Sequence, residues 1–421
     1  MLFILVAASI GFVGLSLAQS PVPPKNFRVS LSVSPFTESV LRNGVIFSDG
    51  GAIAQTTDEL QRMFKAHGAN EVYARIATTR VLNPGNGDHS VNRGLERAVL
   101  AKALSLPFNP EIGLWKAYGD ITCQPSPDFR DYPQLKAPGE WTSLRLDQML
   151  PILRAYGAMV AREILNTGVQ VRIWDLGNEV DYGMAGVAIP PGSPQACAST
   201  EGGPGWYKAP NAIDPAIGRM SATELRKMSE PERIAWLRAH LWPHLAKMFA
   251  AVADGIRSVD PKARFSTHLA FSRAPAQCLA FFTAMRMGGF FPDELGFSYY
   301  PTSSRNTLQA FKETATTVHR ELGRPVFLAE FGYPADKMQG PFAWNTEQEN
   351  YALNSEGQAA FTRDLVAWGV ETGVLSGIRP WAPDLIVPVW GPMSLFALDG
   401  KTATARPALD AIAAGLRSRL R

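Results

Sequence analysis

The strongest constraint on the fold of this chain is a strict alternation of short apolar runs with longer segments of helical periodicity. The apolar runs end at Gly, Pro or Asn, which is typical of buried strands. The segments between them repeat apolar residues every three to four positions, as at Leu153, Tyr156, Val160 and Ile164. Strands are predicted at 27–33, 71–77, 112–118, 169–176, 264–269, 295–299, 326–330 and 374–378. Helices are predicted at 57–67, 95–103, 144–165, 230–259, 275–287, 307–322, 356–372 and 405–418.

Such alternation indicates a parallel sheet covered by helices. Eight strand-helix units within 421 residues favour a closed (β/α)8 TIM barrel. An open doubly wound sheet is the structural alternative, but no Gly-rich phosphate loop follows the first predicted strand. Because no internal repeat or interdomain linker is visible, residues 21–421 are predicted to form one domain.

The first 20 residues form an apolar segment, with small residues at Ser16–Ala18 in a plausible cleavage position. We interpret it as a signal peptide and expect a secreted or periplasmic protein with no stable membrane association after its removal. An uncleaved N-terminal anchor is the competing interpretation, because no Lys or Arg precedes the apolar run. No later segment is long and apolar enough to span a bilayer.

Three cysteines are present: Cys123, Cys197 and Cys278. In an exported protein one disulfide and one buried thiol is a plausible state. Cys123 and Cys197 are the preferred pair, because both lie in loops that follow predicted strands and so share one face. Three unpaired buried cysteines is the alternative.

Charge and composition exclude several classes of partner. The formal net charge is +3 and no Lys/Arg block with interleaved aromatics occurs, so nucleic acid is not an expected partner. None of the six histidines stands at metal-ligand spacing, and the cysteines suggest no zinc site. We therefore predict no metal and no cofactor.

Two glutamates each close a predicted strand. Glu179 follows the run 169–178, and Glu330 closes 325–329. Residues at the C-terminal ends of barrel strands meet on one face, where the active sites of such barrels lie. A carboxyl pair in that position suits glycoside hydrolysis, in which one carboxyl protonates the leaving oxygen while the other attacks or activates water. Asn178 could donate a hydrogen bond to a sugar hydroxyl beside the reacting carbon.

The longest predicted loops follow strands and therefore lie on the same face as the two glutamates. They carry several aromatic side chains, whose planes suit the apolar C–H faces of sugar rings. These are Trp141, Trp206, Tyr207, Tyr300, Trp344, Trp381 and Trp390. An aromatic-rich cleft favours a polysaccharide ligand, although we expect about half of these rings to pack the loops only.

Several motifs occur in the order seen in one enzyme family. They are WDLGNEV at 174–180, LGFSYYP at 295–301, RPVFLAEFGYP at 324–334 and LFALDGK at 395–401. With these motifs the chain resembles the clan A glycoside hydrolases, most closely family 53, the arabinogalactan endo-β-1,4-galactanases. The resemblance covers roughly residues 27–409 and implies a retaining double displacement.

The resemblance also implies roles for individual residues. Glu179 corresponds to the acid/base and Glu330 to the nucleophile, which Arg75 would brace and keep ionised. Substrate contacts are implied for five further residues: Tyr118, Asp120, His268, Tyr300 and Trp381.

The chain departs from the family pattern at three places. Ala117 stands where the family has a His before Tyr118, and 76–79 replaces a Trp-containing turn. The eighth predicted strand lacks the acidic residue that the family has before the aromatic, and reads Arg379-Pro380-Trp381. These departures bear on galactan preference more than on hydrolysis. A clan A enzyme acting on mannan or β-glucan is one alternative, and a non-catalytic carbohydrate-binding barrel is another.

Overall fold

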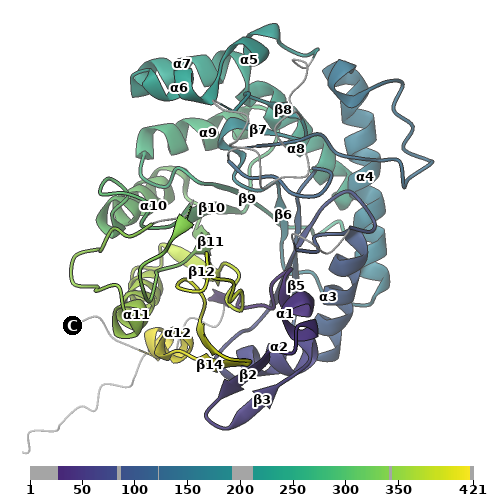
Figure 1. Ribbon diagram of the computed structural model, residues 1–421. Coiled ribbons are helices and arrows are strands. Elements are labelled where there is room, and N and C mark those ends of the chain that lie inside the picture. The colour runs from purple at the N-terminus through teal and green to yellow at the C-terminus, as the bar shows by residue number, and fades with distance from the viewer. Residues whose placement is uncertain (1–26, 83–86, 122, 192–211, 341–343, 418–421) are drawn as a thin grey trace, which may run out of the picture.

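A computed structural model describes residues 27–82, 87–121, 123–191, 212–340 and 344–417. Its centre is an eight-stranded parallel sheet in the order β1-β12-β11-β10-β9-β6-β5-β4, ringed by helices (Figure 1). The strands are β1 (Arg28–Val29), β4 (Val72–Ile76), β5 (Phe108–Ile112), β6 (Trp174–Leu176), β9 (Phe265–Leu269), β10 (Glu294–Tyr299), β11 (Val326–Phe331) and β12 (Leu375–Pro380). The predicted (β/α)8 barrel is confirmed.

The outer ring consists of one or more helices after each strand. These are α2 (Thr57–Ala66), α3 (Val91–Ala103), α4 (Leu146–Asn166), α8 (Trp242–Arg257), α9 (Pro275–Met287), α10 (Leu308–Leu322), α11 (Ser355–Thr372) and α12 (Pro407–Arg417). Local signals fix their ends. Thr56 and Glu59 form a capping box at α2, and Asn354 caps α11. Gly323 and Gly373 end α10 and α11 in the left-handed conformation, with φ of 64° and 67°.

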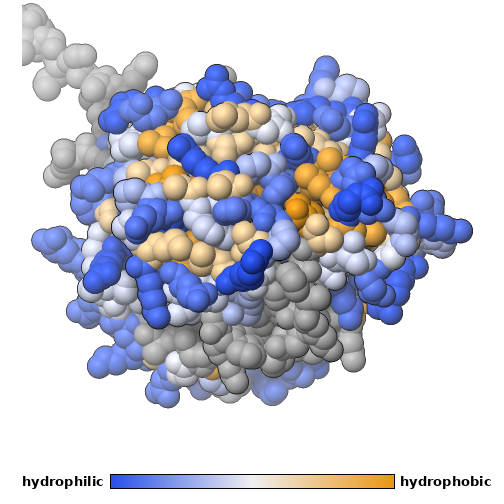
Figure 2. All heavy atoms as spheres, turned by 90° about the horizontal axis from the view of Figure 1, so that it is seen from above, coloured by the Kyte–Doolittle hydropathy of each residue, from blue (hydrophilic) through white to orange (hydrophobic). Residues whose placement is uncertain are grey.

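Additional short elements decorate this ring. They are α1 (Thr37–Arg42), the 3₁₀ turns η2 (Trp141–Ser143) and η3 (Val180–Tyr182), the hairpin β7 (Gly183–Met184) and β8 (Val187–Ala188), α5 (Pro215–Arg219), α6 (Ala222–Lys227) and α7 (Glu230–His240). Figure 2 views the face that α5–α7 lie on; polar side chains cover most of it, with smaller apolar areas between them. No helix within the described ranges is long and apolar enough to cross a membrane.

A second, four-stranded sheet joins the two ends of the domain. Its order is β13 (Phe396–Asp399), β14 (Thr402–Ala405), β2 (Ile46–Asp49) and β3 (Ala52–Ala54). The β14–β2 pair is parallel and connects Thr402 with Ile46. This sheet, which the sequence did not predict, ties the C-terminal hairpin to the first strand-helix connection.

Two predicted elements differ most from the structure, the third strand in position and the fourth helix in extent. The predicted strand 112–118 is in fact β5 at Phe108–Ile112, which pairs along its length with β4. The backbone turns directly afterwards, because Leu114 has a left-handed φ of 59°. The predicted helix 230–259 is two helices, α7 and α8. Pro243, in the first turn of α8, has no N–H to continue the α7 ladder.

The barrel closes between β1 and β4 without a continuous backbone ladder between them in the described strands. Asn70 makes the first link: its N–H donates to the Val29 carbonyl at 3.1 Å, and its side-chain oxygen accepts from the Val29 N–H at 2.9 Å. Ser32 Oγ accepts from the Tyr73 N–H at 2.9 Å. Hydrogen bonds of the Asn70 and Ser32 side chains therefore help to join the β1 and β4 segments, which no main-chain ladder connects among the described residues.

Apolar packing holds the helices to the outside of the sheet. Helices α4 and α8 approach each other closely at two glycines. A Cβ on Gly255 would lie 2.0 Å from the Arg154 carbonyl oxygen, and a Cβ on Gly157 would lie 2.5 Å from the Val252 carbonyl oxygen, so a larger residue at either position would clash. The inside of the barrel is different, since charged side chains fill it. Arg28 donates to Glu71 at 2.8 and 2.9 Å, to Glu294 at 2.5 Å and to Asn109 at 2.6 Å, all in buried positions.

Cysteine pairing partly matches the prediction. Cys123 is disulfide-bonded, and Cys278 is a free, buried thiol. Cys197, its expected partner, lies outside the described residues, as do the N-terminal segment 1–20, Trp206 and Tyr207. The alternative of three unpaired cysteines is therefore wrong.

We predict that Arg28→Met destabilises the protein by about 3–5 kcal/mol, because it leaves Glu71 and Glu294 buried without their shared cation. The half-exposed pair Arg62–Asp58 offers a matched control, and Arg62→Met should change the free energy of unfolding by less than about 1 kcal/mol. Urea unfolding of both variants measures the difference. Equal losses would contradict a structural role of the buried cluster.

Candidate active site

The fold brings the two predicted glutamates into one site at the C-terminal end of the barrel. Glu179 follows β6, and Glu330 lies in β11. His268 of β9 lies between them: its Nε2 accepts the Glu179 N–H at 3.3 Å and lies 3.9 Å from Glu330 Oε1. Residues separated by 151 positions thus contact one shared side chain.

The backbone at Glu179 is held in an unusual conformation. Its φ of 47° and ψ of 57° are left-handed, which costs a non-glycine residue roughly 1–2 kcal/mol. Gln124 stabilises this turn by donating to the Asn178 carbonyl at 2.6 Å and to the Glu179 carbonyl at 3.4 Å. The turn directs the Glu179 carboxyl towards the Ile121 N–H, which donates to it at 3.3 Å.

The environment of Glu179 favours its protonated form. Burial, with the nearby carboxylate of Glu330 as the next cause, raises the pKa of Glu179 well above its usual range. The negative charge of Asp120 acts in the same direction. A carboxyl that keeps its proton near neutral pH can act as a general acid.

Glu330 has the opposite environment. The Arg75 guanidinium of β4 donates to Oε1, and the Tyr300 hydroxyl donates to Oε2 at 3.1 Å. A fixed cation and a hydrogen-bond donor both favour a carboxylate. The two glutamates are therefore arranged as one acid and one anion.

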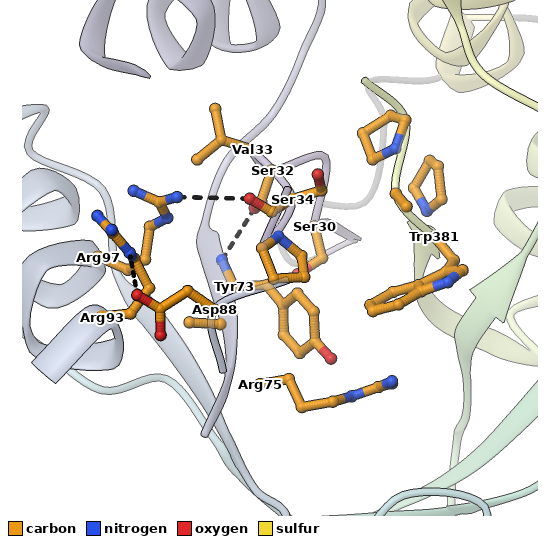
Figure 3. A pocket seen from close by; sticks show the side chains of 15 residues that line it. Ser30, Ser32, Val33, Ser34, Tyr73, Arg75, Asp88, Arg93, Arg97 and Trp381 are labelled. Carbon is orange, nitrogen blue, oxygen red and sulfur yellow. Dashed lines mark hydrogen bonds and ion pairs between the residues drawn. The ribbon is translucent and has the colours of Figure 1, made fainter. Parts of the chain in front are cut away.

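Trp381 and Tyr118 surround the Arg75 side chain. Its guanidinium lies 4.3 Å from the Trp381 ring centre and 5.7 Å from that of Tyr118. Figure 3 shows Arg75 extended beneath Trp381, beside a cavity of about 20 Å³ that Ser30, Ser32 and Tyr73 line at the β1–β4 closure. That space suffices for one water molecule.

Asn178 and His268 lie at the site, each with a different arrangement from the one expected. One N–H of the Asn178 amide donates to the Gly119 carbonyl at 2.7 Å, and its side-chain oxygen is buried without a partner. The Asn178 side-chain oxygen is therefore available to accept a hydrogen bond from a sugar hydroxyl. His268 is only 1% exposed, and burial lowers its pKa to about 3, so it is a neutral ring that supports both glutamates.

The remaining loop aromatics divide into two groups. Trp344 and Trp390 pack with Tyr300, at ring distances of 5.1 and 6.1 Å, and form a wall beside Glu330. Trp141 instead donates to the Ala185 carbonyl at 2.6 Å and packs on Phe129. The first group suits sugar binding, and Trp141 orders the loops.

Sequence reasoning missed Glu111, Arg379 and Gln124. Glu111 lies on β5 and accepts from Arg75 and from Arg379, the latter at 3.0 Å. It escaped notice because the third strand was placed after it, in the more apolar stretch. Arg379 was noted only as a departure from a family pattern. No sequence signal indicated Gln124, whose role depends on tertiary contact.

No group of three or more His, Cys, Asp or Glu side chains that could hold a metal ion occurs in the described part of the chain. Asp181, next to Glu179, serves the backbone instead. Its carboxylate accepts the Ala270 N–H at 2.7 Å and the Phe271 N–H at 3.1 Å, which fixes the loop after β9.

Comparisons with known proteins agree with this geometry. The model of glycosyl hydrolase family 53 matches residues 224–403, a range that includes Glu330. A structure of fungal β-1,4-galactanases has a TM-score of 0.65 at 18% identity over 92% of this chain and 99% of that one. The GH53 catalytic domain of Ignisphaera aggregans has a TM-score of 0.67 at 16% identity, over 94% and 98% of the two chains.

An intracellular xylanase of Thermoanaerobacterium saccharolyticum, solved with xylotriose, has a TM-score of 0.52 at 15% identity, over 92% and 95% of the two chains. No curated protein matches the chain. The barrel, its paired carboxyls and the family match over residues 224–403 indicate a glycoside hydrolase similar to those of clan A. Within that clan the chain is similar to family 53 and is galactanase-like.

Tyr300→Phe should lower kcat/KM by roughly 10- to 100-fold, because a hydrogen bond to a charged group contributes about 1.5–3 kcal/mol. Its neighbour provides a matched control, since the Tyr299 hydroxyl donates instead to the Asn306 carbonyl at 3.3 Å. Tyr299→Phe should leave the rate within about twofold. Steady-state kinetics on one soluble polysaccharide test both variants, and equal rates would remove Tyr300 from the site.

Proposed function

We propose that the protein is an exported, retaining endo-β-1,4-galactanase that hydrolyses galactan or arabinogalactan by double displacement. The observation that carries the proposal is the contrast between the two glutamates: the raised pKa of Glu179 favours its protonated form, whereas Glu330 is bound by Arg75 and Tyr300. Such a contrast is what an acid/base and a nucleophile require.

In the first step the Glu330 carboxylate attacks the anomeric carbon while Glu179 gives its proton to the leaving oxygen. A covalent glycosyl-enzyme then forms, and the shortened polysaccharide departs. In the second step Glu179, now ionised, takes a proton from water, which attacks the anomeric carbon and releases Glu330. Asn178, through its unpartnered oxygen, could accept a hydroxyl hydrogen bond that strengthens as positive charge develops on the ring.

The galactan preference is supported by the family 53 match and by the likeness to fungal β-1,4-galactanases. The aromatic wall of Tyr300, Trp344 and Trp390 suits a polymer of neutral sugars. Ala117 and Arg379 differ from the family pattern, so another β-glycan such as mannan or β-glucan is the second candidate substrate.

Export is proposed from two features. The segment 1–20 has the composition of a signal peptide, and the disulfide at Cys123 is typical of proteins that fold in an oxidising compartment. A secreted or periplasmic location would also place the enzyme where a polysaccharide is accessible. N-terminal sequencing of the mature protein tests this, and a retained Met1 would contradict cleavage.

Glu330→Gln should lower kcat on β-1,4-galactan by at least about 10⁴-fold, because the amide cannot form the glycosyl-enzyme. Binding of galacto-oligosaccharides, measured by calorimetry, should persist. Glu349→Gln, at an exposed acidic residue, is the control and should retain full activity. The substrate panel should include galactan, arabinogalactan, mannan, xylan and mixed-linkage glucan. Wild-type protein that binds these glycans but releases no product would instead be a carbohydrate-binding barrel.

The pH profile of kcat/KM should be bell-shaped, and the rate should fall on the alkaline side as Glu179 loses its proton. Because the pKa of Glu179 is raised, this alkaline limb should lie well above that of an ordinary glutamate. With an aryl glycoside whose leaving group needs no protonation, Glu179→Ala should abolish the limb. Added azide should then yield a glycosyl azide of retained configuration, and an inverted product would exclude double displacement.

A further inference from the structure

A chain of alternating charges runs through the barrel from Glu330. Arg75 donates to Glu330 through Nη2 and to Glu111 through Nε. Arg379 donates to the second oxygen of Glu111 at 3.0 Å and, through its other terminal nitrogen, to Asp175. These five residues come from five different strands, and each is at most 5% exposed.

We propose that Glu111 and Arg379 are positioning residues that set, through Arg75, the pH range in which Glu330 is ionised. Neither residue contacts the Glu330 carboxylate itself. The inference rests on the proposed function of Glu330 and goes beyond it, because it assigns control of the nucleophile to charges deeper in the barrel.

The geometry of Arg75 links Glu111 to Glu330. The Arg75 guanidinium is planar, so a bond from Nε to Glu111 fixes the direction in which Nη2 reaches Glu330. Glu111 is itself held from two further sides, by Arg379 at 3.0 Å and by the Tyr73 hydroxyl at 3.0 Å. Arg75 therefore has one orientation, and Glu111 determines it.

The charges of Glu111 and Arg379 also act on Glu330. Charges in this buried region act on one another over several ångströms with little screening. Glu111 offsets part of the positive charge that Arg75 presents to Glu330, and Arg379 offsets part of Glu111. Removing the negative charge of Glu111 should therefore favour the Glu330 carboxylate, whereas removing the positive charge of Arg379 should disfavour it.

Asp175 modulates the charge that Arg379 presents to Glu111. Burial raises the pKa of Asp175 to about 6, against the opposing charge of Arg379. Below that pH Asp175 is neutral, and the full charge of Arg379 then acts on Glu111. The effect of Arg379 is thus largest on the acidic side, where Glu330 must lose its proton.

Other charged and titratable groups face this chain and are kept constant in the test. Tyr73 lies 3.7 Å beneath the Arg379 guanidinium, and Asn109 accepts from Arg379 at 2.6 Å. Further groups that face the chain are Glu179, His268, Tyr300, Tyr118, Arg28 and His89.

The test is the pH dependence of kcat/KM on the polysaccharide that the wild type cleaves. Arg379→Gln should move the acidic limb up by about one pH unit, and Glu111→Gln should move it down by a similar amount. Arg379→Lys keeps the charge and should return the limb close to that of the wild type. Thermal unfolding of each variant runs alongside.

Glu71→Gln is the matched control, because Glu71 is a buried acid of the same barrel that binds Arg28 instead. It should lower the melting temperature and leave the acidic limb in place. If Arg379→Gln does not fold, Glu111→Gln and Arg379→Lys still decide the question.

Acidic limbs that stay at the wild-type pH, or that move in the same direction in Glu111→Gln and Arg379→Gln, overturn the inference and leave only a structural role. That result would leave the proposed function intact as long as the wild type hydrolyses and Glu330→Gln does not. Absence of hydrolysis by the wild type overturns both.

Discussion

The structure depends on the ionic interior of its barrel. Arg28, Arg75 and Arg379 project from three strands and bind carboxylates that come mostly from strands across the barrel. Each charge would cost several kcal/mol if it were buried alone, so each requires its partners in place. The same requirement fixes the register of the strands, since a shift by one residue would move these side chains to the apolar outer face.

This interior also produces the chemical asymmetry of the site. The charged side chains end at Arg75, which lies against Glu330, and none of the described arginines of the barrel binds Glu179 in the same way. Glu179 sits instead on a left-handed turn that His268 and Gln124 support from below. Glu330 is thus part of the network of ion pairs, whereas Glu179 lies outside it.

Much of this could be predicted from the sequence, because periodicity and strand-end motifs are local. The alternation of strands and helices placed seven of the eight barrel strands, and the remaining prediction met β5 only at Ile112; the two glutamates stood at strand ends. Strand β5 was misplaced because its sequence, FNPEI, carries polar residues that are buried by ion pairing rather than by apolar contact. Pattern reasoning assigns such residues to loops.

Other features required tertiary information. Gln124 acts on carbonyls 54 and 55 positions away, and nothing in its neighbourhood indicates this. His268 was expected to line the substrate subsite, and its contacts with both glutamates could not be predicted, because the direction of a strand-end side chain depends on the register of its strand. Arg379, which differs from a family pattern, has its explanation in Asp175 and Glu111.

The parallel pairing of β14 with β2 has a consequence for how the protein is made. Ile46 is synthesised long before its partner Thr402. During translation β2 therefore has an unpaired edge until β14 is made, and another chain could pair with that edge. The edge of β2 is covered only once β14 has been synthesised, and a variant without the β13–β14 hairpin would keep that edge exposed.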